Sequence, residues 1–200
     1  QAPESNRAAG GLDYDYGAQG LNYIPLHVHS DYSILDGLES VEAIVKQAVK
    51  LKIPAVALTD LTNICGYIKF YSACRANGIK PIMGADLLVE EPVKQGEEPR
   101  VFRLTVLAMD RVGKQNLYDL LSEAWLRSHP GSFDAYTKLD ELAKFSAGLI
   151  VLNGFRGDLA YYIADHNQKK LHERVQFYLE HFGDRFCLEL TRTGREGEGS

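Results

Sequence analysis

The chain has 200 residues, 45% hydrophobic and 24% charged, with 22 basic and 27 acidic side chains for a formal net charge of −5. This length and composition suit one globular domain with a sizeable core, and no stretch has the ~18 consecutive apolar residues of a membrane span or the pattern of a signal peptide. The acidic balance argues against a domain that grips duplex DNA by its phosphates, and it favours a scaffold or protein-binding role.

Residues 1–20 differ in composition from the rest of the chain. They hold four glycines and four alanines, and they show no apolar periodicity. We expect a flexible extension or an expression remnant here, followed by one domain over residues 21–200. The alternative is an ordered arm that uses Leu12, Tyr14 and Tyr16.

Two histidines follow a short apolar run. Residues 23–26 read as a buried strand, and His27 and His29 come directly after it. Because alternate side chains of a strand share a face, both imidazoles should point the same way. Asp36 and Gly37 follow in a polar loop. A His-x-His pair at the end of a strand can start a metal site, since imidazole is the commonest metal ligand, or it can be a hydrogen-bonded surface pair.

Helical and strand-like patterns then alternate along the chain. Ser40 is a good N-cap for the first helix, and Pro54 ends that helix before a continuous apolar run typical of a strand covered on both faces. The expected helices are 41–51, 66–77, one following residue 109, one near 139–145, 158–165 and 169–182. The expected strands are 23–26, 55–58, 79–83, 101–109, 149–152 and 186–190.

Several side chains between and within these elements have predicted environments. Residues 90–100 are charged and broken by prolines and a glycine, which indicates a hairpin tip, and residues 128–136 form a loop with an exposed His129. Trp125 should lie in the core. In the last long helix the residues expected to face inward are Leu171, Val175, Leu179 and Phe182. The histidines expected to face solvent are His166, His172 and His181.

Three cysteines, Cys65, Cys74 and Cys187, are scattered along the sequence. An odd number without regular spacing implies no disulfide framework, and it fits a reducing cytoplasm. All three are expected to be buried small apolar residues rather than ligands or nucleophiles.

Alternating strands and helices argue for parallel strands with covering helices, in a barrel or a doubly wound sheet. Residues 27–37, His-Val-His-Ser-Asp-Tyr-Ser-Ile-Leu-Asp-Gly, resemble the opening motif of the PHP (polymerase and histidinol phosphatase) domain family. The likeness is to the copy found at the N-terminus of gamma-proteobacterial DNA polymerase III alpha subunits, and it covers roughly residues 21–195. The further blocks that follow in the family's order are 57–63, 78–86, 104–108, 113–117, 148–152 and 182–190.

The resemblance implies an α/β fold, a PHP-type irregular (β/α)7 barrel. About 180 residues and six expected strands fall short of the ~250 residues of an eight-unit barrel, so we expect a C-terminally truncated barrel with an open edge. Functional side chains would then gather at one rim of this barrel, where His27, Asp36, Leu61, Asp86 and Phe155 emerge.

Active PHP domains hold two or three metal ions at this rim, and the resemblance allows each ligand position to be checked. His27 and His29 match the opening pair, and Asp36 matches a carboxylate ligand. Asp86 stands in place of a bridging glutamate, with a shorter side chain, and Glu189 lies where relatives place a carboxylate. In a vestigial site, the two histidines should be held by hydrogen bonds to neighbours such as Asp36 or Asp60.

Three other ligand positions carry residues that cannot coordinate a metal. Leu61 follows Asp60 where relatives have a histidine, Arg103 is a fixed cation at another histidine position, and Phe155 replaces a cysteine. A closing Asp-x-His block is absent from the sequence. A metal cluster needs nearly all of its ligands and their supporting residues, so the resemblance implies a degenerate site.

Two functions therefore remain. The first is a catalytically inactive domain of a replicative DNA polymerase that needs no cofactor itself, with the Mg²⁺ of polymerisation in an absent palm domain. Its partners would be the proofreading exonuclease subunit and the rest of the cytoplasmic polymerase III holoenzyme, and it would meet DNA only through the parent protein. The second is an active phosphoesterase or 3′–5′ proofreading nuclease that uses Zn²⁺ or Mn²⁺. A standalone sugar or amino-acid phosphatase is disfavoured by the block at 113–117.

Overall fold

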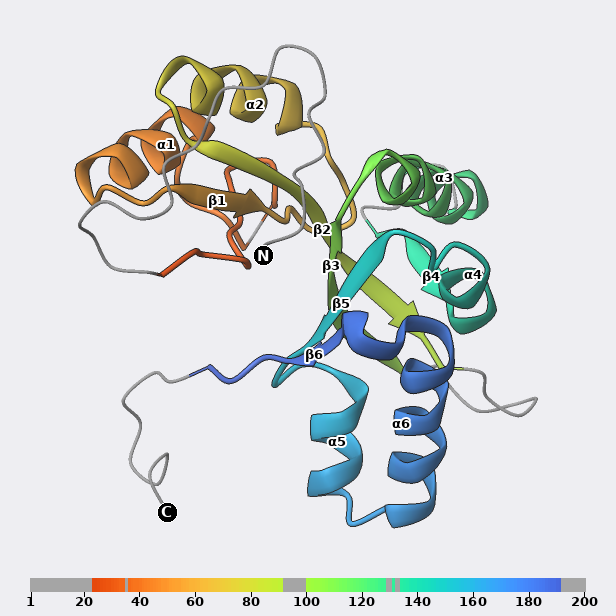
Figure 1. Cartoon of the computed structure of the whole chain (residues 1–200). Coiled ribbons are helices and arrows are strands. Elements are labelled where there is room, and N and C mark those ends of the chain that lie inside the picture. The colour runs from red at the N-terminus through yellow and green to blue at the C-terminus, as the bar shows by residue number, and fades with distance from the viewer. Residues whose placement is uncertain (1–22, 35, 92–99, 129–130, 132–133, 192–200) are drawn as a thin grey trace, which may run out of the picture.

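One mixed sheet organises the chain, and helices pack around it (Figure 1). The computed structural model describes residues 23–34, 36–91, 100–128, 131 and 134–191, so the expectations for residues 1–20, for the tip at 92–99 and for His129 lie outside the described residues. Within the described part, no helix is both long and apolar enough to cross a membrane.

Helices and strands alternate along most of the chain, which confirms the α/β class. The strands are β1 (Ala55–Leu58), β2 (Lys80–Glu90), β3 (Val101–Ala108), β4 (Tyr136–Lys138), β5 (Leu149–Asn153) and β6 (Phe186–Leu188). The helices are α1 (Val41–Lys50), α2 (Tyr67–Ala76), α3 (Arg111–Arg127), α4 (Leu139–Lys144), α5 (Asp158–Ala164), α6 (Gln168–Phe182) and the short 3-10 turn η1 (Gly183–Arg185).

The sheet runs in the order β1-β2-β3-β5-β6, with β4 paired to the far end of β2. The pairs β1–β2, β2–β4 and β5–β6 are parallel, but β2–β3 and β3–β5 are antiparallel. The prediction of parallel strands throughout was therefore wrong. The connection between β2 and β3 carries no helix among its described residues, and Glu91 N–H donates to Arg100 O at 2.8 Å, which closes the expected hairpin.

Strand β2 is much longer than the predicted strand at 79–83. Gly84 does not break it, because a Cβ there would lie 2.5 Å from Val106 O and only glycine permits this close approach of β3. The strand therefore runs on through Asp86, which pairs with Thr105. Asp86 consequently sits in the middle of a strand, and not at a strand end where the barrel interpretation placed it.

The segment at residues 23–26 is not a regular strand, which corrects another prediction. It lies along β1, where Ala57 N–H donates to Pro25 O at 2.9 Å and Thr59 N–H donates to Val28 O at 2.8 Å. Pro25 has no N–H to return, and Val28 N–H donates to the side chain of Thr59 at 2.9 Å. The segment is thus fixed on one side without forming a ladder.

Helix α3 and the strand after it also differ from expectation. Trp125 is 39% exposed and not a core residue, and its indole N–H donates to Thr62 O at 2.6 Å. Residues 136–138 form the short strand β4, which was not predicted, since three residues are too short to show a strand pattern.

The predicted inward face of α6 was partly wrong. Phe182 is buried and Leu171 and Val175 pack against the core, but Leu179 is 55% exposed, and Tyr178 and Arg174 are buried instead. Buried hydrogen-bonding partners draw these two polar side chains inward. His166 and His172 are exposed as expected, whereas His181 is half-buried against the ring of Phe177, 4.7 Å away.

The prediction that the cysteines are buried was right only for Cys74, which packs with α1, α2 and β1 in one of the hydrophobic clusters. Cys65 and Cys187 are exposed, and all three thiols are free. A larger cluster joins β2, β3 and β5 to α3, α4 and α6. Figure 1 shows the two regions, with α1 and α2 beside β1 and α5 and α6 beyond the other end of the sheet.

Candidate functional site

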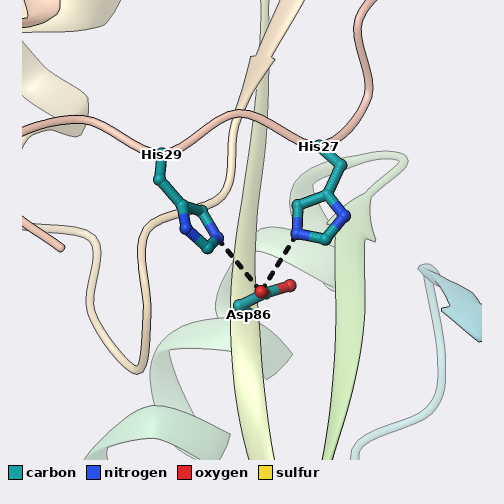
Figure 2. A group of neighbouring side chains, drawn as sticks. All are labelled: His27, His29 and Asp86. Atoms are coloured by element: carbon teal, nitrogen blue, oxygen red, sulfur yellow. Dashed lines mark hydrogen bonds and ion pairs between the residues drawn. The ribbon is translucent and has the colours of Figure 1, made fainter. Parts of the chain in front are cut away.

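The two histidines of the opening motif project from the first segment onto the sheet. Hydrogen bonds between Val28 and Thr59 attach this segment to the end of β1. His27 and His29 flank Val28 and share a face, as the spacing predicted, and Figure 2 shows both rings pointing toward Asp86 on β2. The ring centroids lie 5.2 Å apart. The backbone register thus brings two imidazoles to one carboxylate.

Asp86 is the buried centre of the site. Its Oδ2 accepts hydrogen bonds from His27 Nε2 and His29 Nε2, both at 3.0 Å, and its Oδ1 accepts one from the hydroxyl of Thr105 on β3. Burial alone would raise the pKa of Asp86, but the hydrogen bonds from His27 and His29 outweigh burial and hold that pKa well below its usual range. The carboxylate is therefore ionised across the ordinary pH range.

His27 bridges two acidic groups. Its Nε2 faces Asp86, and its Nδ1 lies 3.0 Å from both carboxylate oxygens of Glu189, which follows β6. Burial alone would lower the pKa of His27, but the hydrogen bonds to Asp86 and Glu189 raise it to about 10. With an acceptor at each ring nitrogen, the imidazolium form is favoured at neutral pH.

Asp36 meets cations instead of the histidines. Arg103 Nη1 on β3 lies 2.5 Å from Asp36 Oδ2, and Arg156 Nη1 lies 3.9 Å from Asp36 Oδ1. Arg103 N–H also donates to Arg156 O at 3.0 Å, which holds the two arginines together. The expectation that Asp36 would anchor a histidine was therefore wrong, because a fixed guanidinium lies closer to it.

Asp60 does not hold the histidines either. It is fully buried and accepts hydrogen bonds from the backbone and hydroxyl of Ser30 and from the hydroxyl of Ser33, at 2.7 to 3.0 Å. Its carboxylate therefore stabilises the loop between His29 and Asp36. Because side chains alternate in direction along an extended segment, the side chain of Asp60 faces that loop and not the two imidazoles.

One cavity of about 240 Å³ is lined by both histidines, Asp36, Asp86 and Glu189, whereas Asp60 does not border it. Of the ligand positions lost in this sequence, Arg103 and Phe155 line the cavity, whereas Leu61 does not. Leu61 is tied to the site through its backbone, by a bridge to Asp86 and an N–H donated to Ser33 Oγ at 2.9 Å. Four of the five predicted rim residues, all but Leu61, thus line one cavity. Its lining residues are His27, His29, Asp36, Asp86, Arg103, Thr105, Gly154, Phe155, Arg156 and Glu189.

Some side chains of this cavity could coordinate a metal ion. Among the described residues, His27, His29 and Asp86 offer ligand atoms that all lie within 4.8 Å of one another. Two imidazole nitrogens and one carboxylate oxygen are donors that Zn²⁺ takes in proteins. The second carboxylate, Asp36, is paired with Arg103. In the described part of the chain, His27, His29 and Asp86 form the single group of at least three such donors that lie close enough together to hold an ion.

Sequence reasoning missed Thr105 and Asn153. Thr105 donates to Asp86, and it shares a strand face with Arg103 two residues earlier, so the strand period offered a signal for it. Asn153 O accepts from Glu189 N–H at 2.9 Å and so positions that glutamate at the end of β6. No sequence pattern could have found this contact, because it depends on the pairing of β5 with β6.

The sequence of the chain is similar to those of known proteins. The family model described as "PHP domain" matches residues 25–193. The chain is 45% identical over 179 residues to the DNA polymerase III subunit alpha of Escherichia coli K12 and 42% identical over 179 residues to that of Vibrio cholerae. Each alignment covers 89% of this chain but 15% of the relative, so the chain spans about a seventh of the length of these proteins.

A solved structure of an amidohydrolase from Chromobacterium violaceum resembles the chain in its fold. The TM-score is 0.51 at 14% sequence identity, with 88% of each chain covered. At this identity the likeness concerns the fold alone, and it agrees with the mixed α/β arrangement of one sheet and surrounding helices.

Proposed function

Since the chain belongs to the PHP domain family, we propose that it is the PHP domain of a bacterial DNA polymerase III alpha subunit. The similarity to alpha subunits extends over nearly nine tenths of the chain. Most of the length of those relatives lies outside this sequence. The proposed parent protein is a DNA-directed DNA polymerase of the bacterial cytoplasm, and its metal-dependent nucleotidyl transfer would belong to another domain.

We further propose that this domain has no catalytic activity of its own. The observation that carries this proposal is the ion pair between Arg103 and Asp36, inside the cavity where a metal cluster would need free carboxylates. Asp36, Asp86 and Glu189 supply three negative charges, which are matched by Arg103, Arg156 and protonated His27. To bind these carboxylates, a divalent ion would have to displace either the proton of His27 or an arginine guanidinium.

The proposed role is then that of a platform for the proofreading exonuclease subunit. Support comes from the family resemblance and from the acidic balance of the chain, which suits protein contacts better than duplex binding. The test is co-purification of the parent alpha subunit with the exonuclease subunit, with and without this domain. Undiminished binding after removal of the domain would contradict the platform role.

A metal-dependent phosphoesterase is the second candidate, and the three converging donors of His27, His29 and Asp86 favour it. When bound there, an ion would supply an activated water and polarise a phosphoryl oxygen. His27 and His29 would have to release their hydrogen bonds to Asp86 and present neutral nitrogens to the ion.

Elemental analysis of chain purified without chelator separates the two candidates. We expect substoichiometric Zn, Mn and Fe and no metal-stimulated hydrolysis of bis-p-nitrophenyl phosphate. Asp86→Asn is the control, because it removes the carboxylate charge that both histidines share and replaces it by a neutral amide of similar size. Stoichiometric metal together with turnover that Asp86→Asn abolishes would establish the phosphoesterase and overturn the inactive assignment.

A further inference from the structure

A second hollow lies beside the candidate site, on the outer side of β3. It has a volume of about 630 Å³ and lies between the start of β3, the turn before α5 and the exposed face of α5. We propose that this surface, here called the arginine groove, binds single-stranded nucleic acid. Its functional side chains are Arg100, Arg103, Phe155, Arg156 and Tyr161.

Charge is the first observation behind the proposal. The described residues that line the arginine groove include three arginines and no aspartate or glutamate, in a chain whose net charge is −5. Asp36 reaches Arg103 and Arg156 only from the adjoining cavity. Arg156 remains 52% exposed and lies 3.9 Å from that carboxylate, so its guanidinium can also reach a phosphate in the groove.

Exposed aromatic rings beside these cations are the second observation. Phe155 is 64% exposed, with the Arg156 guanidinium 5.4 Å from its ring centre. Arg100 lies 4.8 Å from the ring centre of Tyr161 on α5. Two cation–aromatic pairs thus border one hollow. Arginines that reach phosphates and aromatic faces that stack on bases are the two elements by which proteins bind single strands without sequence preference.

The same features select a single strand over other anionic partners. An acidic peptide would use the arginines but would gain nothing from the face of Phe155. Paired bases in a duplex are stacked on one another and cannot pack on that ring. The proposed ligand is therefore an unpaired strand of a few nucleotides, held without cleavage.

Fluorescence anisotropy of a labelled oligothymidylate of about ten nucleotides, within the site sizes of single-strand-binding folds, tests the proposal. We expect the 200-residue chain to bind this probe at least tenfold more tightly than a duplex of equal length. Replacing Arg100 and Arg156 together by alanine should remove two phosphate contacts and reduce the slope of log K against log salt by about 1.4, at 0.7 per single-strand contact. Both side chains are largely exposed, so the fold should survive.

The matched control is the double variant Lys46→Ala, Lys50→Ala, which removes the same charge from α1, where both lysines border a different hollow. It should leave the slope unchanged. Phe155→Leu should weaken binding by about fivefold or more while Phe155→Tyr retains it, because only the ring face is lost in the first.

Three results would overturn the proposal. The first is equal weakening by the arginine and lysine double variants, which would indicate non-specific attraction. The second is unchanged affinity in Phe155→Leu. The third is competition by an oligoglutamate peptide as effective as that by unlabelled oligothymidylate, which would identify a surface for acidic peptides.

Discussion

The guanidinium of Arg103 lies 2.5 Å from the carboxylate of Asp36, in the same cavity as the two histidines of the opening motif. A fixed cation that cannot be deprotonated thus takes up an oxygen that a metal cluster would require. The pair is half-buried on both sides, so solvent screens it only in part. Substitution of Arg103 should therefore change the metal affinity of the site.

Removal of this cation should make the site more receptive to metal. We expect Arg103→Met to raise the affinity for Zn²⁺ by on the order of tenfold, because a nearby positive charge no longer opposes the ion and Asp36 is freed. Isothermal titration calorimetry with Zn²⁺ measures this change. Arg127→Met, which breaks an ion pair with Glu141 elsewhere, is the control and should change nothing. An unchanged affinity in Arg103→Met would show that Arg103 does not oppose metal binding.

The charge on His27 should make stability depend on pH. Its pKa is raised from 6.5 to about 10 by Asp86 and Glu189 against the opposing effect of burial. Because the pKa of His27 is higher in the folded than in the unfolded chain, protonated His27 stabilises the fold. This stabilisation is fully present below pH 6.5 and is lost as the pH rises toward 10. In chelator-treated protein we expect the free energy of unfolding to fall by roughly 1–2 kcal/mol between pH 6.5 and 8.5. Each pKa unit corresponds to about 1.4 kcal/mol, and the partial exposure of His27 reduces the effect.

Urea unfolding at several pH values between 6.5 and 8.5 measures this slope. The upper limit avoids Cys74, whose pKa burial raises to about 12, so that its thiol titrates in the unfolded chain near pH 9. His27→Ala should cost roughly 1–2 kcal/mol at pH 7, as a lost hydrogen bond does, and should flatten the profile. A slope that survives in His27→Ala would assign the effect to another group.

Arg174 holds a buried acidic network beneath α6. Its Nε lies 3.0 Å from Asp158 Oδ2 and its Nη2 lies 3.5 Å from Glu91 Oε1. Arg174→Met should cost about 3–5 kcal/mol, because it leaves buried carboxylates without their cation. The cost should shrink at low pH, since burial raises the pKa of Asp158 and its protonation removes the unpaired charge. Urea denaturation at pH 7 and pH 5 measures both effects.

The control for Arg174→Met is Lys169→Met on the same helix. Lys169 is exposed and lies 4.0 Å from Glu173, so its loss should change the free energy of unfolding by less than about 0.5 kcal/mol. Equal costs for the two variants would show that the buried network contributes no more than a surface ion pair.

Gly113 should be intolerant of any side chain. A Cβ at this position of α3 would lie 1.8 Å from Gly148 O, a backbone atom that cannot rotate away. Gly113→Ala should therefore cost about 1–3 kcal/mol through overpacking, despite the better helix propensity of alanine. Thermal or urea unfolding measures the cost, and Val112→Ala on the exposed side of the same turn should stay within about 0.5 kcal/mol. An unchanged free energy of unfolding in Gly113→Ala would show that α3 can shift away from Gly148 without cost.

Duplex DNA should bind this chain weakly. The net charge of −5 repels the phosphate backbone, so we expect a dissociation constant no tighter than ~10⁻⁴ M at physiological salt. Anisotropy with a labelled duplex measures it. Micromolar affinity with a steep salt dependence would contradict this expectation.

The amino-acid sequence by itself determined the alternation of elements and most of the site. Continuous apolar runs located β1 and β5, because strands covered on both faces have no polar positions. The spacing of His27 and His29 predicted their common face, and the ordered motifs identified Asp36, Asp86 and Glu189 as members of one site. These features depend on local spacing or on residue identity, both of which are present in the chain before it folds.

Only the tertiary structure decided which of these groups meet. Asp36 pairs with Arg103, and Glu189 pairs with His27, because strand register and the hairpin after β2 set distances that spacing along the chain does not contain. The antiparallel strands, the exposure of Trp125 and the close approach at Gly84 have the same origin. Each results from contacts between segments far apart in sequence, where a single hydrogen bond or a backbone contact outweighs local propensity.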